Sequence, residues 1–366
     1  MASAHAPSRE GSIAAVRQAD GRLGIRRHVL VLPATINTSP IADRIADGRP
    51  RLVSAAHDHG RGQFGADADL TRNVLVGMGR HPNVAGTVVV GSSTDAWVTG
   101  LRDQVAPVPA RLVDTADGCY RSWIEAGEAA TDELIDQLGA GRESVGLDSL
   151  VVGLVASDLA QSTVRTVHPL IADALTELVD RGARVLVAGV DRLLPFPDET
   201  RAAVADRPSV DRLFAKTADA PPRHRLVGLR VRASGFDDVT GFLGELGIDR
   251  VMECGDAVEP GPGVTVLDVS SRFEEATTAL AAAGAHLVVH LTATGATAGH
   301  PVVPVITVSG DDETLAAIPE AIDLDARTTD PATVLSTIRH VASGDHTATE
   351  RTGLTTVAIP RIGPTL

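Results

Sequence analysis

Aromatic residues are scarce in this 366-residue chain, at 2% of the sequence. Because 43% of the residues are nonetheless hydrophobic, the core has to be built from aliphatic side chains, and it is large enough for more than one domain. Lys216 is the only lysine, and the net charge is -14. An acidic chain does not favour a groove for phosphate backbones, so we expect no nucleic-acid partner.

Cysteine is almost as scarce, and long apolar runs do not occur. Cys119 and Cys254 lie far apart, without the spacing of a disulfide framework or a metal site. No stretch reaches the roughly 20 apolar residues that a membrane span needs, and the polar first residues do not have the pattern of a signal peptide. These absences predict a cytoplasmic protein without a membrane partner.

Short runs rich in valine and leucine alternate with longer amphipathic stretches. Several of these runs are apolar on both faces, as strands of parallel sheets are. The alternation predicts an α/β protein with two Rossmann-like domains, whose mainly parallel sheets are flanked by helices. We expect a flexible N-terminus over 1–19, an N-terminal α/β domain over 20–145, a C-terminal α/β domain over 146–345 and a tail over 346–366.

The predicted elements cover most of the chain. The predicted strands are 28–33, 52–56, 84–90, 150–155, 184–188, 226–231, 250–253, 265–269, 286–291 and 304–308. The predicted helices are 67–79, 123–138, 170–181, 199–216, 237–246 and 273–283. Because parallel sheets bind ligands at the carboxyl ends of their strands, functional residues should follow the strands directly.

Three segments carry motifs of a known family. Residues 20–33 read DGRLGIRRHVLVLP, and residues 287–310 read LVVHLTATGATAGHPVVPVITVSG. The most specific segment combines AAHDHGRGQFG at 55–65 with RHPNVAGTVVVG at 80–91. In these motifs the chain resembles the altronate/galactarate dehydratase family, from about Asp20 to Ala326.

The resemblance implies a lyase that eliminates water from a sugar acid or another small hydroxy-carboxylate. A related branch removes sulfite from sulfolactate. The resemblance also implies a divalent metal, usually iron, because a metal that chelates the carboxylate and hydroxyl stabilises the developing charge. The nitrogen and oxygen ligands that this chain offers would suit manganese, magnesium, zinc or iron. Family enzymes use a small β domain, either fused or on a separate chain. We therefore expect a separate small β-domain subunit, together with a homo-oligomer of this chain.

The chain departs from the family at the positions of its cysteines, where it carries Asn37, Arg61, Thr94 and Ala156. These residue types do not form a thiolate site, so we expect no iron–sulfur cluster. The sequence also has no Walker phosphate loop and no dinucleotide fingerprint, so we expect no nucleotide. The losses leave an alternative open, in which the chain is a non-catalytic or repurposed member that binds a small acid or serves as a subunit of a complex.

Two pairs of residues lie in the family motifs. His57 and His59 follow a predicted strand, and we predict that they act as catalytic groups or metal ligands, since imidazole serves both roles near neutral pH. The alternative is two loop histidines that cap backbone groups. Arg22 and Arg26 lie in the opening loop, and a guanidinium fork suits a substrate carboxylate. Their alternative is solvation, or pairing with an acidic side chain.

The remaining candidates follow predicted strands or precede predicted helices. We predict that hydroxyl and backbone groups bind the substrate at Ser92, Ser93, Thr94, Thr292 and Thr294. We predict further metal ligands, beside His57 and His59, at Asp95, Asp158 and His168. For the two aspartates, the alternative is an ordinary helix N-cap, which the same residue type favours.

Overall fold

Three sheets organise the chain in the computed structural model, which describes residues 11–139, 141–217 and 231–361. Two of the sheets are parallel, with four and seven strands, and the third is a small antiparallel sheet of three strands. The predicted α/β architecture with mainly parallel sheets flanked by helices is confirmed. None of the helices in these described ranges is long and apolar enough to cross a membrane.

The four-stranded sheet has the order β4-β3-β5-β6. Its strands are β3 (His28–Pro33), β4 (Leu52–Ser54), β5 (Val84–Gly91) and β6 (Ala110–Asp114). Its helices are α1 (Ser39–Ala46), α2 (Ala66–Gly79), α3 (Ala96–Gln104) and α4 (Tyr120–Asp136). Alternation along β3 sends Val29 and Val31 into the core beneath α1 and α4, whereas Leu30 and Leu32 pack with α2 and α3.

The seven-stranded sheet has the order β10-β11-β9-β8-β12-β13-β14. Its strands are β8 (Val151–Ala156), β9 (Arg184–Ala188), β10 (Arg250–Glu253), β11 (Gly263–Asp268), β12 (Leu287–Leu291), β13 (Val305–Ser309) and β14 (Leu324–Asp325). The helices of this part are α5 (His168–Asp180), α6 (Pro197–Ala203), α7 (Arg207–Thr217), α9 (Phe236–Thr240), α10 (Phe273–Ala282), α11 (Asp312–Ala317), α12 (Pro331–Ala342) and α13 (Ala348–Thr352).

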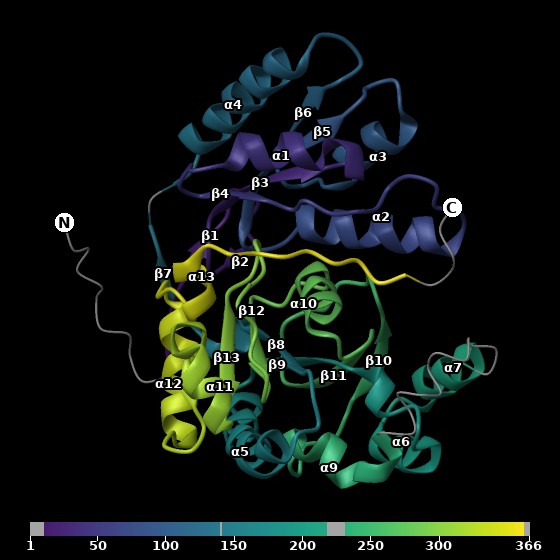
Figure 1. The fold of residues 1–366 in the computed structure, drawn as a ribbon, viewed down its shortest axis with the longest axis vertical. Coiled ribbons are helices and arrows are strands. Elements are labelled where there is room, and N and C mark those ends of the chain that lie inside the picture. Colours follow the sequence, from purple (N-terminus) through teal and green to yellow (C-terminus); the bar gives the residue numbers. More distant parts are fainter. Residues whose placement is uncertain (1–10, 140, 218–230, 362–366) are drawn as a thin grey trace.

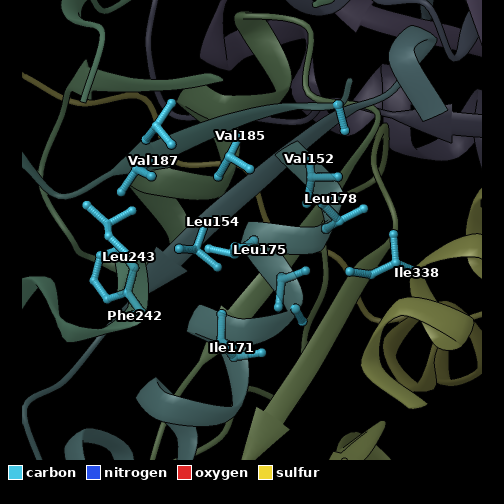
Figure 2. Packing of buried hydrophobic residues seen from close by; sticks show 14 of the residues in the cluster. Val152, Leu154, Ile171, Leu175, Leu178, Val185, Val187, Phe242, Leu243 and Ile338 are labelled. Atoms are coloured by element: carbon cyan, nitrogen blue, oxygen red, sulfur yellow. The ribbon is translucent and has the colours of Figure 1, made fainter. Parts of the chain in front are cut away.

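One face of the seven-stranded sheet packs against α5. Figure 2 shows Val152 and Leu154 of β8 and Val185 of β9 facing Leu175 and Leu178 of this helix. Burying an aliphatic side chain of this size stabilises the fold by about 1.5–3 kcal/mol. This cluster therefore holds α5, and with it the start of that helix, at a fixed place beside the strand ends.

Helices α2 and α10 lie between the two parallel sheets (Figure 1). Their backbones approach closely, since a Cβ on Gly77 would lie 2.3 Å from the carbonyl oxygen of Ala282. Glycine at position 77 is what permits this approach. One buried cluster runs from the four-stranded sheet through both helices to the seven-stranded sheet, so the two sheets share a core.

The order of strands in the seven-stranded sheet marks where a ligand would bind. After β8 the chain continues to β9 on one side, and it later returns to place β12 on the other side. Open parallel sheets bind ligands outside the carboxyl ends of their strands, at such a reversal of strand order. In this sheet that point lies between the ends of β8 and β12.

Both ends of the described chain are more ordered than the sequence analysis predicted. Strand β1 (Ser12–Arg17) lies within the expected flexible terminus and pairs with β2 (Leu23–Gly24) and β7 (Glu143–Gly146), because its apolar residues are buried. The expected tail contains α13 and the buried Ile359. The predicted strand at 226–231 falls, except for its last residue, outside the described residues.

Candidate active site at the ends of β8 and β12

Asp158 lies two residues beyond β8 and connects that strand end to the loop after β12. Its Oδ1 accepts hydrogen bonds from the backbone N–H of Ala160, at 3.1 Å, and from the hydroxyl of Thr163, at 2.7 Å. Its Oδ2 accepts from the hydroxyl of Thr292, at 3.1 Å, and from the backbone N–H of Ala293, at 2.7 Å. Two loops that are more than 130 residues apart in sequence are thus joined at the reversal of strand order.

The loop after β12 turns tightly around Thr292. The hydroxyl oxygen of Thr292 accepts from the backbone N–H groups of Thr294 and Gly295, at 3.0 and 3.1 Å. The hydroxyls of Thr292 and Thr294 lie 3.3 Å apart. The structure therefore brings three of the predicted site residues together: Asp158, Thr292 and Thr294.

His168 is buried at the start of α5, near Asp158. Neither of its ring nitrogens makes a hydrogen bond of good geometry with another described residue. The backbone of Asp238 lies near the ring and raises the pKa of His168, against the larger effect of burial. Burial, and then the charge of Arg192, lower the pKa of His168 to about 4, against an opposing effect of Asp158. The imidazole is therefore neutral near pH 7, and the backbone of Asp238 is the one hydrogen-bonding group among the described residues that its ring nitrogens approach.

Ser157 and His290 add a second imidazole to this strand edge. The Ser157 hydroxyl and Nε2 of His290 lie 2.8 Å apart, and the His290 ring packs on Phe273 with 4.2 Å between ring centroids. Burial lowers the pKa of His290 to about 3. This histidine is a neutral hydrogen-bonding group that positions the hydroxyl of Ser157.

Arg192 was missed by the sequence analysis and lies beside the same strand ends. It belongs to the 3₁₀ turn Val190–Arg192 after β9, and its side chain is only 4% exposed. Nη2 donates to the carbonyl oxygens of Ala156 and Asp158, the latter at 2.7 Å. Nε and Nη1 are buried and have no partner among the described residues. Its place directly after a predicted strand is the feature of the sequence that could have marked it as a site residue. It lies outside the family motifs.

The predicted catalytic histidines lie at the other parallel sheet and already have partners. Nδ1 of His57 accepts from the backbone N–H of His59, at 3.1 Å, and Nε2 of His57 donates to the carbonyl oxygen of Pro33, at 2.9 Å. Burial lowers the pKa of His57 to about 4. In His59, Nε2 accepts from Arg361 at 3.2 Å, and Nδ1 lies 2.6 Å from a carboxylate oxygen of Asp58. A catalytic role would require these contacts to break.

The predicted carboxylate-binding arginines also have their donors committed. Arg22 forms an ion pair with Asp20 at 2.7 Å and donates to three backbone carbonyls. Arg26 holds Glu350 through Nε at 2.8 Å and Nη2 at 2.9 Å, and it donates to three further carbonyls. No N–H group of either guanidinium is left over, so substrate binding by these residues would require rearrangement.

The hydroxyl cluster after β5 lies at the exposed edge of the four-stranded sheet. Asp95 accepts from the backbone N–H of Trp97 at 2.9 Å, which is the helix N-cap alternative. The backbone of Ser93 donates to Asp114 at 2.8 Å, and the hydroxyls of Ser92 and Thr94 lie 2.8 Å apart. The predicted site residues Ser92, Ser93, Thr94 and Asp95 therefore lie together, away from Asp158.

The five predicted metal ligands are divided between the two sheets. His57, His59 and Asp95 follow strands of the four-stranded sheet, whereas Asp158 and His168 lie beside the seven-stranded sheet. Within residues 11–139, 141–217 and 231–361, no group of three or more His, Cys, Asp or Glu side chains is arranged to hold a metal ion. The predicted ligand set is not assembled in this geometry.

Comparison with known proteins identifies the family. Residues 15–139 match the profile of the second domain of D-galactarate dehydratase/altronate hydrolase. Residues 242–365 match the profile of the C-terminal part of D-galactarate/altronate dehydratase. Together the matches cover more than half of the chain. The chain belongs to the D-galactarate/altronate dehydratase family. The resemblance inferred from its motifs is confirmed.

Individual relatives are named as dehydratases or as a sulfo-lyase subunit. The chain is 27% identical over 331 residues to the beta subunit of (2R)-sulfolactate sulfo-lyase of Chromohalobacter salexigens, which covers 84% of each chain. It is 24% identical to altronate dehydratase of Escherichia coli, over 99% of this chain and 80% of that protein. It is 23% identical to altronate dehydratase of Bacillus subtilis, over 85% of this chain and 68% of that protein.

Proposed function

We propose that this chain is a lyase that eliminates water from a small hydroxy-carboxylate, and that the reaction takes place around Asp158. The observation that carries the proposal is the convergence of Asp158, His168 and Arg192 at the reversal of strand order, where the His168 ring is neutral and Nε and Nη1 of Arg192 have no partner among the described residues. Membership of a family whose named relatives are dehydratases and a sulfo-lyase supports the reaction class. Elimination of sulfite from a sulfonated hydroxy acid is the related alternative within this class.

Elimination needs a group that takes the proton from Cα while hydroxide leaves the neighbouring carbon and is protonated to water. His168 is neutral and lies beside the strand ends, so it can accept that proton. Burial, and after it the charge of Arg192, lowers the pKa of His168 in the free protein. A bound anion beside Arg192 would offset only the second of these effects and so raise the pKa of His168, because an opposite charge favours the imidazolium.

A divalent metal stays a prediction from the family. A bound metal would polarise the carboxylate and the leaving hydroxyl. The described residues offer no group of three ligands for it, so no step of the proposed reaction is assigned to a metal.

A second subunit is part of the proposal. The relative from Chromohalobacter salexigens is named as a beta subunit, and this chain matches most of its length. We expect a separate small subunit to associate with a homo-oligomer of this chain. Full turnover by the purified chain alone would exclude a requirement for the subunit.

Binding of a small acid without turnover is the second candidate function. The commitment of His57, Arg22 and Arg26 to protein partners favours it, because these residues carry the family motifs yet have no free donor or acceptor for a substrate. In that case His168 would bind the acid and transfer no proton.

The test is turnover of a panel of hydroxy acids that includes altronate, galactarate and sulfolactate. Turnover is measured as the release of keto acid or sulfite. His168→Gln should lower turnover by about a hundredfold or more, while Asp330→Asn, at the exposed N-cap of α12, should leave it unchanged. Binding without turnover would favour the second candidate. Equal turnover by the His168→Gln and unmodified chains would contradict the proposed site.

A further inference from the structure

We propose that a cleft of about 750 Å³ at the amino ends of β8 and β12 binds a small zwitterion, with a carboxylate and an ammonium group at opposite ends of an aliphatic body. Ser149 and His286, which line the cleft, lie shortly before β8 and β12. The proposed active site lies at the carboxyl ends of the same strands, so the cleft is a second site that does not depend on the proposed function. Sites for small organic ligands have volumes of about 300–1,000 Å³.

The two sides of the cleft come from different parts of the chain. One side consists of residues from β1, β2 and α2, and the other consists of the segments before β8, after β10 and after α10. The sides meet where Gly77 of α2 packs closely against Ala282 at the end of α10. Val151, Val258 and Ala283 also line the cleft and are buried. An aliphatic body bound against these residues would lose apolar surface to water, which favours binding.

The charged side chains that line the cleft are separated by sign. The positive ones, Arg17, Arg22 and Arg80, all come from the side of α2, and the negative ones, Asp148, Asp256 and Glu259, all come from the opposite side. Within the described residues, no ion pair connects these two sets. A ligand with charges of both signs can therefore contact both sides at once, whereas an ion of one sign can be matched on one side only.

Arg80 is the arginine whose donors are available to a ligand. Arg17 pairs with Glu143 at 2.5 Å, and Arg22 pairs with Asp20 at 2.7 Å. Arg22 also donates to the carbonyl oxygens of Arg80 and His81, which offsets the negative end of α2. The guanidinium of Arg80 is exposed and has no hydrogen-bond or ion-pair partner in the described part of the chain. Its N–H groups suit a carboxylate, which a guanidinium can bind through two oxygens.

The acids on the opposite side suit an ammonium group. Asp148, Asp256 and Glu259 are exposed, and none of their carboxylates has an ion-pair or hydrogen-bond partner among residues 11–139, 141–217 and 231–361. The end of α10 lies on the same side, at Ala282 and Ala283. The last carbonyls of a helix carry partial negative charge, so this end also favours a cation.

The experiment is calorimetric titration of the purified full chain with 6-aminohexanoate, in which an aliphatic chain separates the ammonium group from the carboxylate. The control ligands are hexanoate, which lacks the ammonium group, and hexylamine, which lacks the carboxylate. Each control ligand should bind about tenfold more weakly than 6-aminohexanoate, because each loses one charge-assisted contact.

Two variants assign the contacts to the two sides of the cleft. Arg80→Met should weaken the binding of 6-aminohexanoate about tenfold and leave the binding of hexylamine unchanged, because hexylamine has no carboxylate. Asp256→Asn combined with Glu259→Gln should weaken the binding of 6-aminohexanoate about tenfold and leave the binding of hexanoate unchanged. The substituted side chains are exposed, so both variants should fold, which circular dichroism checks.

The matched controls remove the same charges from exposed positions of α4, outside the cleft. They are Arg121→Met, and Glu125→Gln combined with Glu128→Gln. Both should bind 6-aminohexanoate as the unmodified chain does. His168→Gln should do so as well, and a loss of binding in that variant would contradict a site separate from the proposed active site.

The proposal is overturned if the unmodified chain does not bind 6-aminohexanoate, or if either control ligand binds as tightly as 6-aminohexanoate. It is also overturned if the cleft variants bind 6-aminohexanoate normally. These outcomes are distinct from a failure of the proposed reaction, since binding does not require turnover. A chain that turns over no hydroxy acid and loses affinity for 6-aminohexanoate in both cleft variants would support the zwitterion site and contradict the lyase.

Discussion

Arg192 donates from Nη2 to the carbonyl oxygen of Asp158 at 2.7 Å, while the carboxylate of Asp158 holds the loop after β12. Three strand ends, those of β8, β9 and β12, are therefore tied together at one residue. The contacts fix the backbone around the guanidinium of Arg192, whose Nε and Nη1 have no partner among the described residues.

Asp158→Asn should destabilise the fold. An amide nitrogen cannot accept a hydrogen bond, so two buried donors would lose their acceptor. Each lost acceptor should lower the free energy of unfolding by about 1–3 kcal/mol. Urea unfolding measures the change. The control is Asp114→Asn at the exposed edge of the four-stranded sheet, which should change the free energy of unfolding by less than about 1 kcal/mol. Equal losses in both variants would contradict the bridging role of Asp158.

The stability of the protein should fall as the pH drops from about 6.5 to about 4. Burial lowers the pKa of His168 to about 4 and that of His300 to about 3 in the folded chain, below the ordinary value of 6.5. The unfolded chain therefore binds more protons in this window, and each such histidine costs about 1.4 kcal/mol per pH unit. Above about pH 6.5 the effect vanishes. His300→Gln should flatten this slope, measured by urea unfolding at several pH values, and an unchanged slope would contradict the burial of a neutral ring.

Arg26→Met should cost more stability than loss of a surface ion pair does. The pair between Arg26 and Glu350 is largely buried, and loss of one partner leaves the other charge uncompensated, at about 3–5 kcal/mol. Arg17→Met breaks the exposed pair with Glu143 and should cost less than about 1 kcal/mol. A stability loss in the Arg26 variant that is no larger than the loss in the Arg17 variant would contradict the burial of this pair.

Gly77→Ala should weaken the packing between the two sheets. The added Cβ would meet the carbonyl oxygen of Ala282 at 2.3 Å, so α2 and α10 must move apart, at a cost of about 1–3 kcal/mol or more. The control is Gly100→Ala in α3, where the nearest atom is 3.8 Å away. That change should be neutral or stabilising by up to about 1 kcal/mol. Thermal unfolding of both variants distinguishes the two effects.

Apolar runs were sufficient to predict the buried strands. The predicted bounds of β3, β9 and β10 agree with the structure at both ends, because each is a short run around buried apolar residues, which are valine and leucine in β3 and β9 and Val251 and Met252 in β10. The edge strand β6 was missed, since most of its side chains are partly exposed. The predicted helix at 199–216 is two helices, α6 and α7. The second begins near Pro208, which suits the first turn because it lacks an N–H.

The candidate site could be predicted only in part. Motifs pointed to His57 and Arg26, but the backbone acceptors that occupy these side chains depend on tertiary structure and leave no trace in a motif. Asp158 and Thr292 were each proposed from their place after a strand. Their contact spans more than 130 residues and depends on β8 and β12 being neighbours. Arg192 belongs to no motif, and its importance comes from the donors that folding leaves unpaired.

A crystal structure of the chain with bound lactate tests the central claim most directly. We expect the lactate to lie at the ends of β8 and β12, with its Cα towards the ring of His168. Lactate bound instead at His57 and His59, with its carboxylate on Arg22 or Arg26, would contradict the account and place the active site at the four-stranded sheet.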